Sequence, residues 1–83
     1  MSLRAEVEDR IREALPGADV AVRDLTGTDN HFAARVVTPT FSGLAAVARH
    51  KLVYAPLRDW IADNTVHALA VETLTPEESS HGN

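Results

Sequence analysis

Near the start of the chain, apolar side chains recur at every fourth position, at Leu3, Val7, Ile11 and Leu15. Charged residues fill most of the positions between them, which is typical of a helix with one buried stripe. Ser2 precedes the stripe as a candidate N-cap, and Pro16-Gly17 follows it with residues that end helices. The pattern therefore predicts an amphipathic helix between residue 2 and residue 16.

From Asp19 the apolar period changes to two, as expected for a strand with one buried face. A cluster of turn-forming residues follows at 26–30, and a second alternating run extends over 31–38 before Pro39. Proline cannot continue a paired strand, so it marks the end of the second run. We predict two strands joined by a hairpin loop.

Residues 44–62 return to a three- and four-residue apolar spacing, with Leu44, Val47, Val53, Leu57, Trp60 and Ile61 as its apolar positions. The apolar register slips between Arg49 and Pro56, which predicts two short helices instead of one long helix. Residues 65–73 are rich in β-branched and apolar side chains, so we expect a third strand there. Phe41 and Trp60 are predicted to lie in the core.

The order helix, strand, strand, helix, helix, strand predicts an α+β fold in which helices pack on one face of a three-stranded sheet. A chain of 83 residues has room for one core, so residues 1–78 should form a single domain. Thr75-Pro76-Glu77-Glu78 has the residue order of a helix N-terminus. Because only polar residues and a glycine follow it, we expect at most one helical turn and a disordered polar tail over residues 79–83.

Composition excludes several classes of function. The chain has no cysteine, and therefore no disulfide, thiolate nucleophile or thiolate metal centre of its own. A formal net charge of −4 gives no general attraction to nucleic acid, although it leaves room for a local basic patch. Neither a nucleophile elbow nor a phosphate-binding glycine motif occurs, so we do not expect an enzyme.

The cellular location is predicted from what the sequence lacks. No apolar run approaches the length of a membrane span, and the first residues lack the apolar segment of a signal peptide. We therefore expect a cytoplasmic protein with no membrane partner.

Histidines are the strongest candidate metal ligands in a chain without cysteine. His67 opens the predicted third strand, and His31 follows the predicted hairpin loop, in which Asp29 is a further candidate. For each lone histidine, a structural or merely exposed role is the simpler interpretation. Turn chemistry explains Asp29 without any ligand. The sheet topology decides whether these side chains meet.

A second group of candidates is basic and lies in the helical region: Arg49, His50, Lys51 and Arg58. A solvated helix face explains such a cluster as well as a nucleic-acid-binding patch does. Both interpretations stay open at the level of the sequence.

Several segments, taken in order, closely resemble the BolA-like proteins. They are His31-Phe32, Phe41-x-Gly43, Arg49-His50-Lys51-Leu52-Val53-Tyr54, Val66-His67-Ala68-Leu69 and Thr75-Pro76-Glu77. The resemblance covers about residues 3–78 and implies a fold related to the type II KH domain. The short hairpin loop is similar to that of the compact bacterial branch of the family.

The resemblance implies an adaptor in iron homeostasis. It would bind a monothiol glutaredoxin and share a [2Fe-2S] cluster with it and with glutathione, in cluster assembly, trafficking or iron sensing. His67 matches the family's most dependable cluster ligand. The second ligand in related proteins is a Cys or His of the hairpin loop, but residues 26–30 contain neither. His31 or Asp29 would then take that place, and the chain alone would hold no cluster.

The family also implies an alternative function. Some members are proposed to bind DNA, and here Arg49, His50, Lys51 and Arg58 would contact its phosphates as part of a transcriptional regulator. When it has no partner, the protein is expected to be a monomer or a weak homodimer.

Overall fold

Helix α1 spans Leu3–Ala14 in the computed structural model of the protein, which describes residues 2–81. Ser2 is its N-cap, and the Ser2 hydroxyl accepts a 3.2 Å hydrogen bond from the Ala5 amide. This bond satisfies one of the backbone donors left free at a helix start. Val7 and Ile11 are fully buried, and Leu15 is buried just beyond the helix. The predicted first helix and its buried stripe are confirmed.

Three strands form one sheet in the order β1-β2-β3. β1 (Asp19–Asp24) and β2 (His31–Val37) pair as an antiparallel hairpin, as predicted. β3 (Ala68–Leu74) lies parallel to β2 on its other side, with Ala68 opposite His31. β3 therefore starts three residues after the predicted position, because 65–67 form the approach to the strand. A parallel pair needs a crossover connection, and the helical region supplies it.

The crossover contains two helices separated by a break, as predicted. Its elements are η1 (Pro39–Phe41), α2 (Ala46–Tyr54), η2 (Ala55–Leu57) and α3 (Arg58–Ala62). The break is the 3-10 turn η2, whose second residue is Pro56. The turn η1 was not predicted, and it begins directly after β2 because Thr38 caps it by accepting a hydrogen bond from the Thr40 amide.

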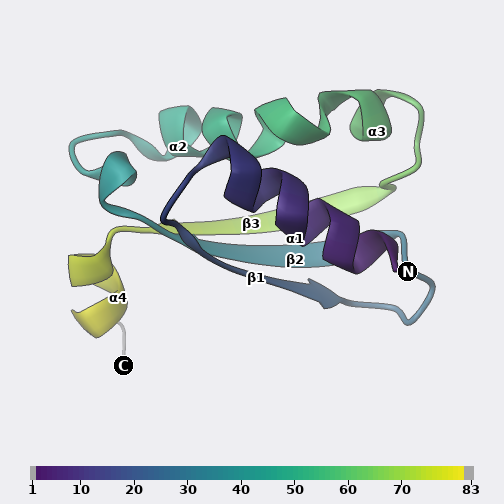
Figure 1. Ribbon diagram of the computed structural model, residues 1–83, viewed down its shortest axis with the longest axis horizontal. Coiled ribbons are helices and arrows are strands. Elements are labelled where there is room, and N and C mark those ends of the chain that lie inside the picture. The colour runs from purple at the N-terminus through teal and green to yellow at the C-terminus, as the bar shows by residue number, and fades with distance from the viewer. Residues whose placement is uncertain (1, 82–83) are drawn as a thin grey trace.

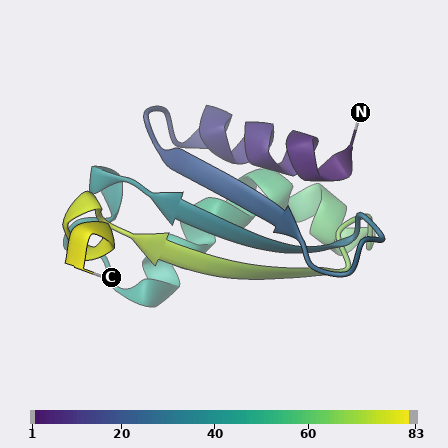
Figure 2. The ribbon, with the colours of Figure 1, turned by 90° about the horizontal axis from the view of Figure 1, so that it is seen from below.

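Helices α1, α2 and α3 cover one face of the sheet, as Figures 1 and 2 show from two directions. The core lies between these two layers, and Phe32, Phe41 and Leu57 are fully buried in it. The apolar pattern of the crossover is only partly used for burial. Trp60 is partly buried against the core, and Val47 is 67% exposed, because α2 turns Val53 inward instead.

A fourth helix, α4 (Pro76–His81), lies at one end of the sheet on the side away from the other helices (Figure 1). A reciprocal cap starts it: the Thr75 amide donates to the Glu78 carboxylate at 2.9 Å, and the Glu78 amide donates to the Thr75 hydroxyl at 3.1 Å. Arg35 donates to the Ser79 hydroxyl at 3.1 Å. The helix is therefore longer than the single predicted turn and occupies 79–81 of the predicted disordered tail. Residues 82 and 83 lie outside the described residues.

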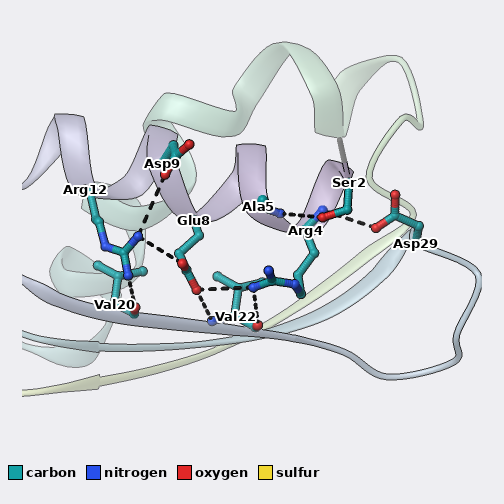
Figure 3. A network of polar contacts seen from close by, with 9 residues as sticks. All are labelled: Ser2, Arg4, Ala5, Glu8, Asp9, Arg12, Val20, Val22 and Asp29. Atoms are coloured by element: carbon teal, nitrogen blue, oxygen red, sulfur yellow. Dashed lines mark hydrogen bonds and ion pairs between the residues drawn. The ribbon is translucent and has the colours of Figure 1, made fainter.

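Side chains of α1 contact the outer edge of β1, where the main-chain groups of Val20 and Val22 point away from β2 (Figure 3). Arg12 donates to the Val20 carbonyl at 3.0 Å, and Arg4 donates to the Val22 carbonyl at 3.2 Å. The Val22 amide donates to the Glu8 carboxylate at 3.1 Å. Glu8 also pairs with Arg12 at 2.9 Å, so one network fixes the helix against the strand edge.

The outer edge of β3 is contacted in the same way by side chains of α2. The Tyr54 hydroxyl donates to the Leu69 carbonyl at 3.0 Å, and Arg49 donates to the Thr73 carbonyl at 3.3 Å. Thus helices supply hydrogen-bond donors to carbonyls on both outer strands. Within residues 2–81, no helix has the length and apolar character needed to cross a membrane.

Candidate metal centre

His31 and His67 lie side by side at one end of the sheet. Their ring centroids are 5.8 Å apart, and the ring planes are tilted by 32°. His31 is the first residue of β2, and His67 directly precedes β3. Because β2 and β3 run parallel, both strands start at the same end of the sheet, and the two side chains meet there. The sequence alone did not show whether these two side chains are adjacent, and the parallel pairing of β2 and β3 makes them so.

The two imidazoles differ in their surroundings. His67 is exposed, while its main-chain amide donates a 2.8 Å hydrogen bond to the Asn30 carbonyl. His31 is half-buried, and its Nδ1 lies 2.6 Å from the Asn30 side-chain oxygen. Among residues 2–81, no hydrogen bond is made by the His67 ring. The His67 main chain is therefore held in place while its imidazole stays open to another molecule.

Asp29 lies at the end of the same loop, but its carboxylate faces helix α1. Its two oxygens accept hydrogen bonds from the amides of Leu3, at 2.8 Å, and Arg4, at 3.1 Å, and Figure 3 draws the second of these bonds. A carboxylate at a helix N-terminus satisfies free donors and faces the positive end of the helix dipole. Asp29 also has a φ of 60°, a conformation that aspartate adopts more readily than most residues. The prediction of Asp29 as a ligand does not fit this geometry.

The donor set fits a shared centre and not a self-contained one. In the part of the chain that the structure describes, no group of three or more His, Cys, Asp or Glu side chains is placed to hold a metal ion. Two imidazoles fall short of the four ligands that an iron–sulfur cluster takes. Because one of the two rings is exposed, ligands from a second molecule have access to it.

The predicted basic cluster is divided by the structure. Arg49 forms a two-pronged ion pair with Glu78, at 2.7 and 3.2 Å, and donates to the Leu44 carbonyl at 2.8 Å. The Arg49 guanidinium, together with the Thr75 amide, lowers the pKa of Glu78 to about 2. The Arg49 side chain is only 14% exposed. Arg49 therefore ties α2 to α4, and a phosphate contact would require it to leave these partners.

Lys51 and Arg58 are exposed and line one groove of about 570 Å³ that is formed by residues of α2, η2 and α3. Tyr54 and Ile61 contribute to the same groove, which joins two cations to an apolar surface. His50 is half-buried on α2 and is not among the lining residues. Two of the four predicted basic residues thus share a surface.

The comparisons with known proteins agree with this architecture. The family model described as "BolA-like protein" matches residues 5–78. The acid stress protein IbaG of Escherichia coli (strain K12) is 34% identical over 73 residues, which cover 88% of this chain and 83% of IbaG. The DNA-binding transcriptional regulator BolA of Vibrio cholerae is 48% identical over 52 residues, which cover 63% of this chain and 48% of that protein.

A solved structure shows the same fold. The bolA protein homologue from Coxiella burnetii matches with a TM-score of 0.75 and 33% identity, over 96% of this chain and 99% of that one. The chain therefore belongs to the BolA-like family. The predicted family and the predicted α+β fold are both confirmed.

Sequence reasoning missed two residues that organise these surfaces. Asn30 was assigned to the turn, but it contacts both His31 and His67. Glu78 was assigned to a helix start, which is correct, but its ion pair with Arg49 spans distant parts of the chain. The capping-box order was the one signal that pointed to Glu78, and no local pattern pointed to the role of Asn30.

Proposed function

We propose that the protein is a non-enzymatic adaptor that binds a monothiol glutaredoxin and donates His67 to a [2Fe-2S] cluster shared with that protein and glutathione. It would act in cluster assembly, trafficking or iron sensing in the cytoplasm. The observation that carries the proposal is the exposed His67 ring beside His31, with centroids 5.8 Å apart, in a BolA-like chain without cysteine.

The division of ligands follows from the chemistry of the side chains. This chain offers imidazole nitrogens, so thiolates have to come from glutaredoxin and glutathione. A cluster with imidazole ligands has a higher reduction potential than one held by thiolates alone. The chain's own part is to hold the His67 main chain through Asn30 and to leave the imidazole accessible. An incomplete ligand set suits passing a cluster on more than storing it.

Anaerobic reconstitution with a monothiol glutaredoxin and glutathione tests the proposal. Visible absorption and circular dichroism are followed while this protein is titrated in. We expect a saturable spectral change for the wild type that is lost or altered in His67→Ala. His50→Ala is the matched control, because it removes an imidazole from α2 and should leave the change intact.

Binding measured by calorimetry, with and without cluster, separates the partner from the ligand. Failure to bind any monothiol glutaredoxin in either state would overturn the proposal as a whole. Binding of the wild type without a His67-dependent spectral change would overturn the ligand assignment alone.

DNA binding is the second candidate function. The groove that contains Lys51 and Arg58 favours it, as does the similarity to a Vibrio cholerae protein named as a DNA-binding transcriptional regulator. The net charge of −4 opposes it. If phosphates bind in this groove, the double variant Lys51→Ala/Arg58→Ala should reduce the log–log salt slope of DNA binding by ~2. An unchanged slope would contradict this candidate.

A further inference from the structure

We propose that Asn30 is the positioning residue of the candidate metal centre. Its side chain fixes which ring nitrogen of His31 carries the proton, and its main chain holds the backbone of His67. This inference rests on the proposed function, because it concerns the two imidazoles that would face the shared cluster. It assigns the nitrogen through which His31 binds, and it adds a residue that touches neither metal nor partner.

The side chain of Asn30 determines which nitrogen of His31 carries the proton. The Asn30 Oδ1 accepts a 2.5 Å hydrogen bond from the Thr28 hydroxyl and lies 2.6 Å from His31 Nδ1. An amide oxygen has lone pairs and no proton, so Nδ1 must donate in this contact. In the neutral ring, the free lone pair is then on Nε2. A metal binds the nitrogen that has no proton, and His31 is therefore prepared to ligate through Nε2.

The main chain of Asn30 acts on the second ring. Its carbonyl accepts hydrogen bonds from the amides of His67, at 2.8 Å, and Ala68, at 3.3 Å. These bonds lie where β3 begins to pair with β2, so they fix the position of His67 at the start of β3. One residue thus contacts both candidate ligands, one through its side chain and the other through its backbone.

The loop in turn holds the side chain of Asn30. The hydroxyls of Thr26 and Thr28 are 2.5 Å apart, so a chain of hydroxyl groups ends on Asn30 Oδ1. The Asp24 carboxylate accepts hydrogen bonds from three amides of the loop, those of Thr26, Gly27 and Asp29. Residues behind a metal ligand that fix its ring in this manner commonly determine its affinity.

The first test reads the tautomer directly in the metal-free protein. Full-length protein labelled with ¹⁵N-histidine is studied by long-range ¹H–¹⁵N correlation at about pH 8.5, above the ordinary imidazole pKa. We expect His31 to be protonated on Nδ1 in the wild type and to lose this preference in Asn30→Ala. Asn30→Asp should retain it, because a carboxylate oxygen also accepts the bond. Asn64→Gly is the control, since it removes another amide at a φ of 64° that glycine tolerates.

The second test reads the shared cluster. In the glutaredoxin titration, Asn30→Ala should raise the protein concentration needed for half-saturation of the spectral change by ~10–100-fold. This is the usual cost of losing such a supporting contact. Asn30→Asp and Asn64→Gly should stay near the wild type. Urea unfolding of each variant shows whether it retains the fold, and Asn30→Asp keeps the test valid if Asn30→Ala does not.

The outcomes separate this inference from the proposed function. An Nε2-protonated His31 in the wild type, or a tautomer that Asn30→Ala leaves unchanged, would overturn positioning by Asn30. A changed tautomer with unchanged saturation would overturn its role toward the cluster. If the wild type itself shares no cluster, the proposed function fails, and the tautomer measurement still decides whether Asn30 sets the His31 ring.

Discussion

The two ends of the sheet use polar side chains in opposite ways. At the α4 end, Arg49 is engaged by Glu78 and by main-chain carbonyls, and its side chain is 14% exposed. At the other end, the His67 ring is exposed and makes no hydrogen bond within residues 2–81. A charged residue whose nitrogens are all engaged within the fold stabilises it, while a polar group left open can bind another molecule. The charge of a residue in the sequence therefore does not identify the binding end of the sheet. Whether its side chain already has hydrogen-bond partners in the structure does.

The largest effect on stability is expected from the packed residue beside Arg49. Phe41 is fully buried, and the Arg49 guanidinium lies 5.9 Å from its ring centroid. Phe41→Ala should lower the free energy of unfolding by ~3–5 kcal/mol, because a large apolar side chain is lost and a cavity remains. Urea denaturation measures this change. A loss below ~1 kcal/mol would contradict the assignment of this end to stability.

At the histidine end, His67→Ala should change ligand binding and leave the stability of the fold almost unchanged. Since the side chain is exposed, we expect the free energy of unfolding to stay within ~0.5 kcal/mol of the wild type. The same variant should lose the glutaredoxin-dependent spectral change. Urea denaturation and the cluster titration are measured on one preparation, and an unfolded variant would instead assign His67 a structural role.

Two arginines of the helical region provide a matched pair. Arg49→Ala should clearly lower the urea midpoint, because it removes the hydrogen bonds that Arg49 donates to Glu78 and to the Leu44 and Thr73 carbonyls. Arg58→Ala removes an exposed cation and should change stability by less than ~0.5 kcal/mol. Equal midpoints for the two variants would contradict the structural role of Arg49.

The smallest effect is expected from pH. The pKa of Glu78 falls from 4.5 to about 2 in the folded protein, chiefly through its hydrogen bond with Arg49. A lowered carboxyl pKa stabilises the fold fully above the unfolded value, and this stability is lost as pH falls from 4.5 to about 2. Solvent screens the pair, because the Glu78 side chain is 46% exposed. Urea midpoints across this window should converge between wild type and Glu78→Gln at the acidic end, and a constant difference would contradict the pairing.

The elements could be predicted because their patterns are local. The four-residue period before Pro16 and the two-residue period after Asp19 each report which side of an element is buried. The three-stranded α+β arrangement followed from their order. The extent of α4 could not be predicted, because Ser79 is bonded by Arg35 from the middle of the sheet.

The candidate site was predictable in its parts and not in its arrangement. His31 and His67 could be chosen because both stand at strand starts, but their contact requires β2 and β3 to be parallel neighbours. Asp29 was predicted as a ligand because its residue type allows it. Its actual partners are the amides at the start of α1, which are far away in the sequence. Arg49 was grouped with Lys51 and Arg58 in one basic cluster, and its ion pair with Glu78 could not be predicted because Glu78 is also distant in the sequence.

The contacts of α1 with the edge of β1 also bear on how the protein behaves at high concentration. An unpaired strand edge is a template on which another chain can add a strand, and repeated addition leads to aggregates and fibrils. Here Arg4, Glu8 and Arg12 occupy the outward-facing groups of Val20 and Val22 with charged side chains. An incoming strand would have to displace these charges before it could pair. The helix that completes the core therefore also protects the hairpin from growing into an intermolecular sheet.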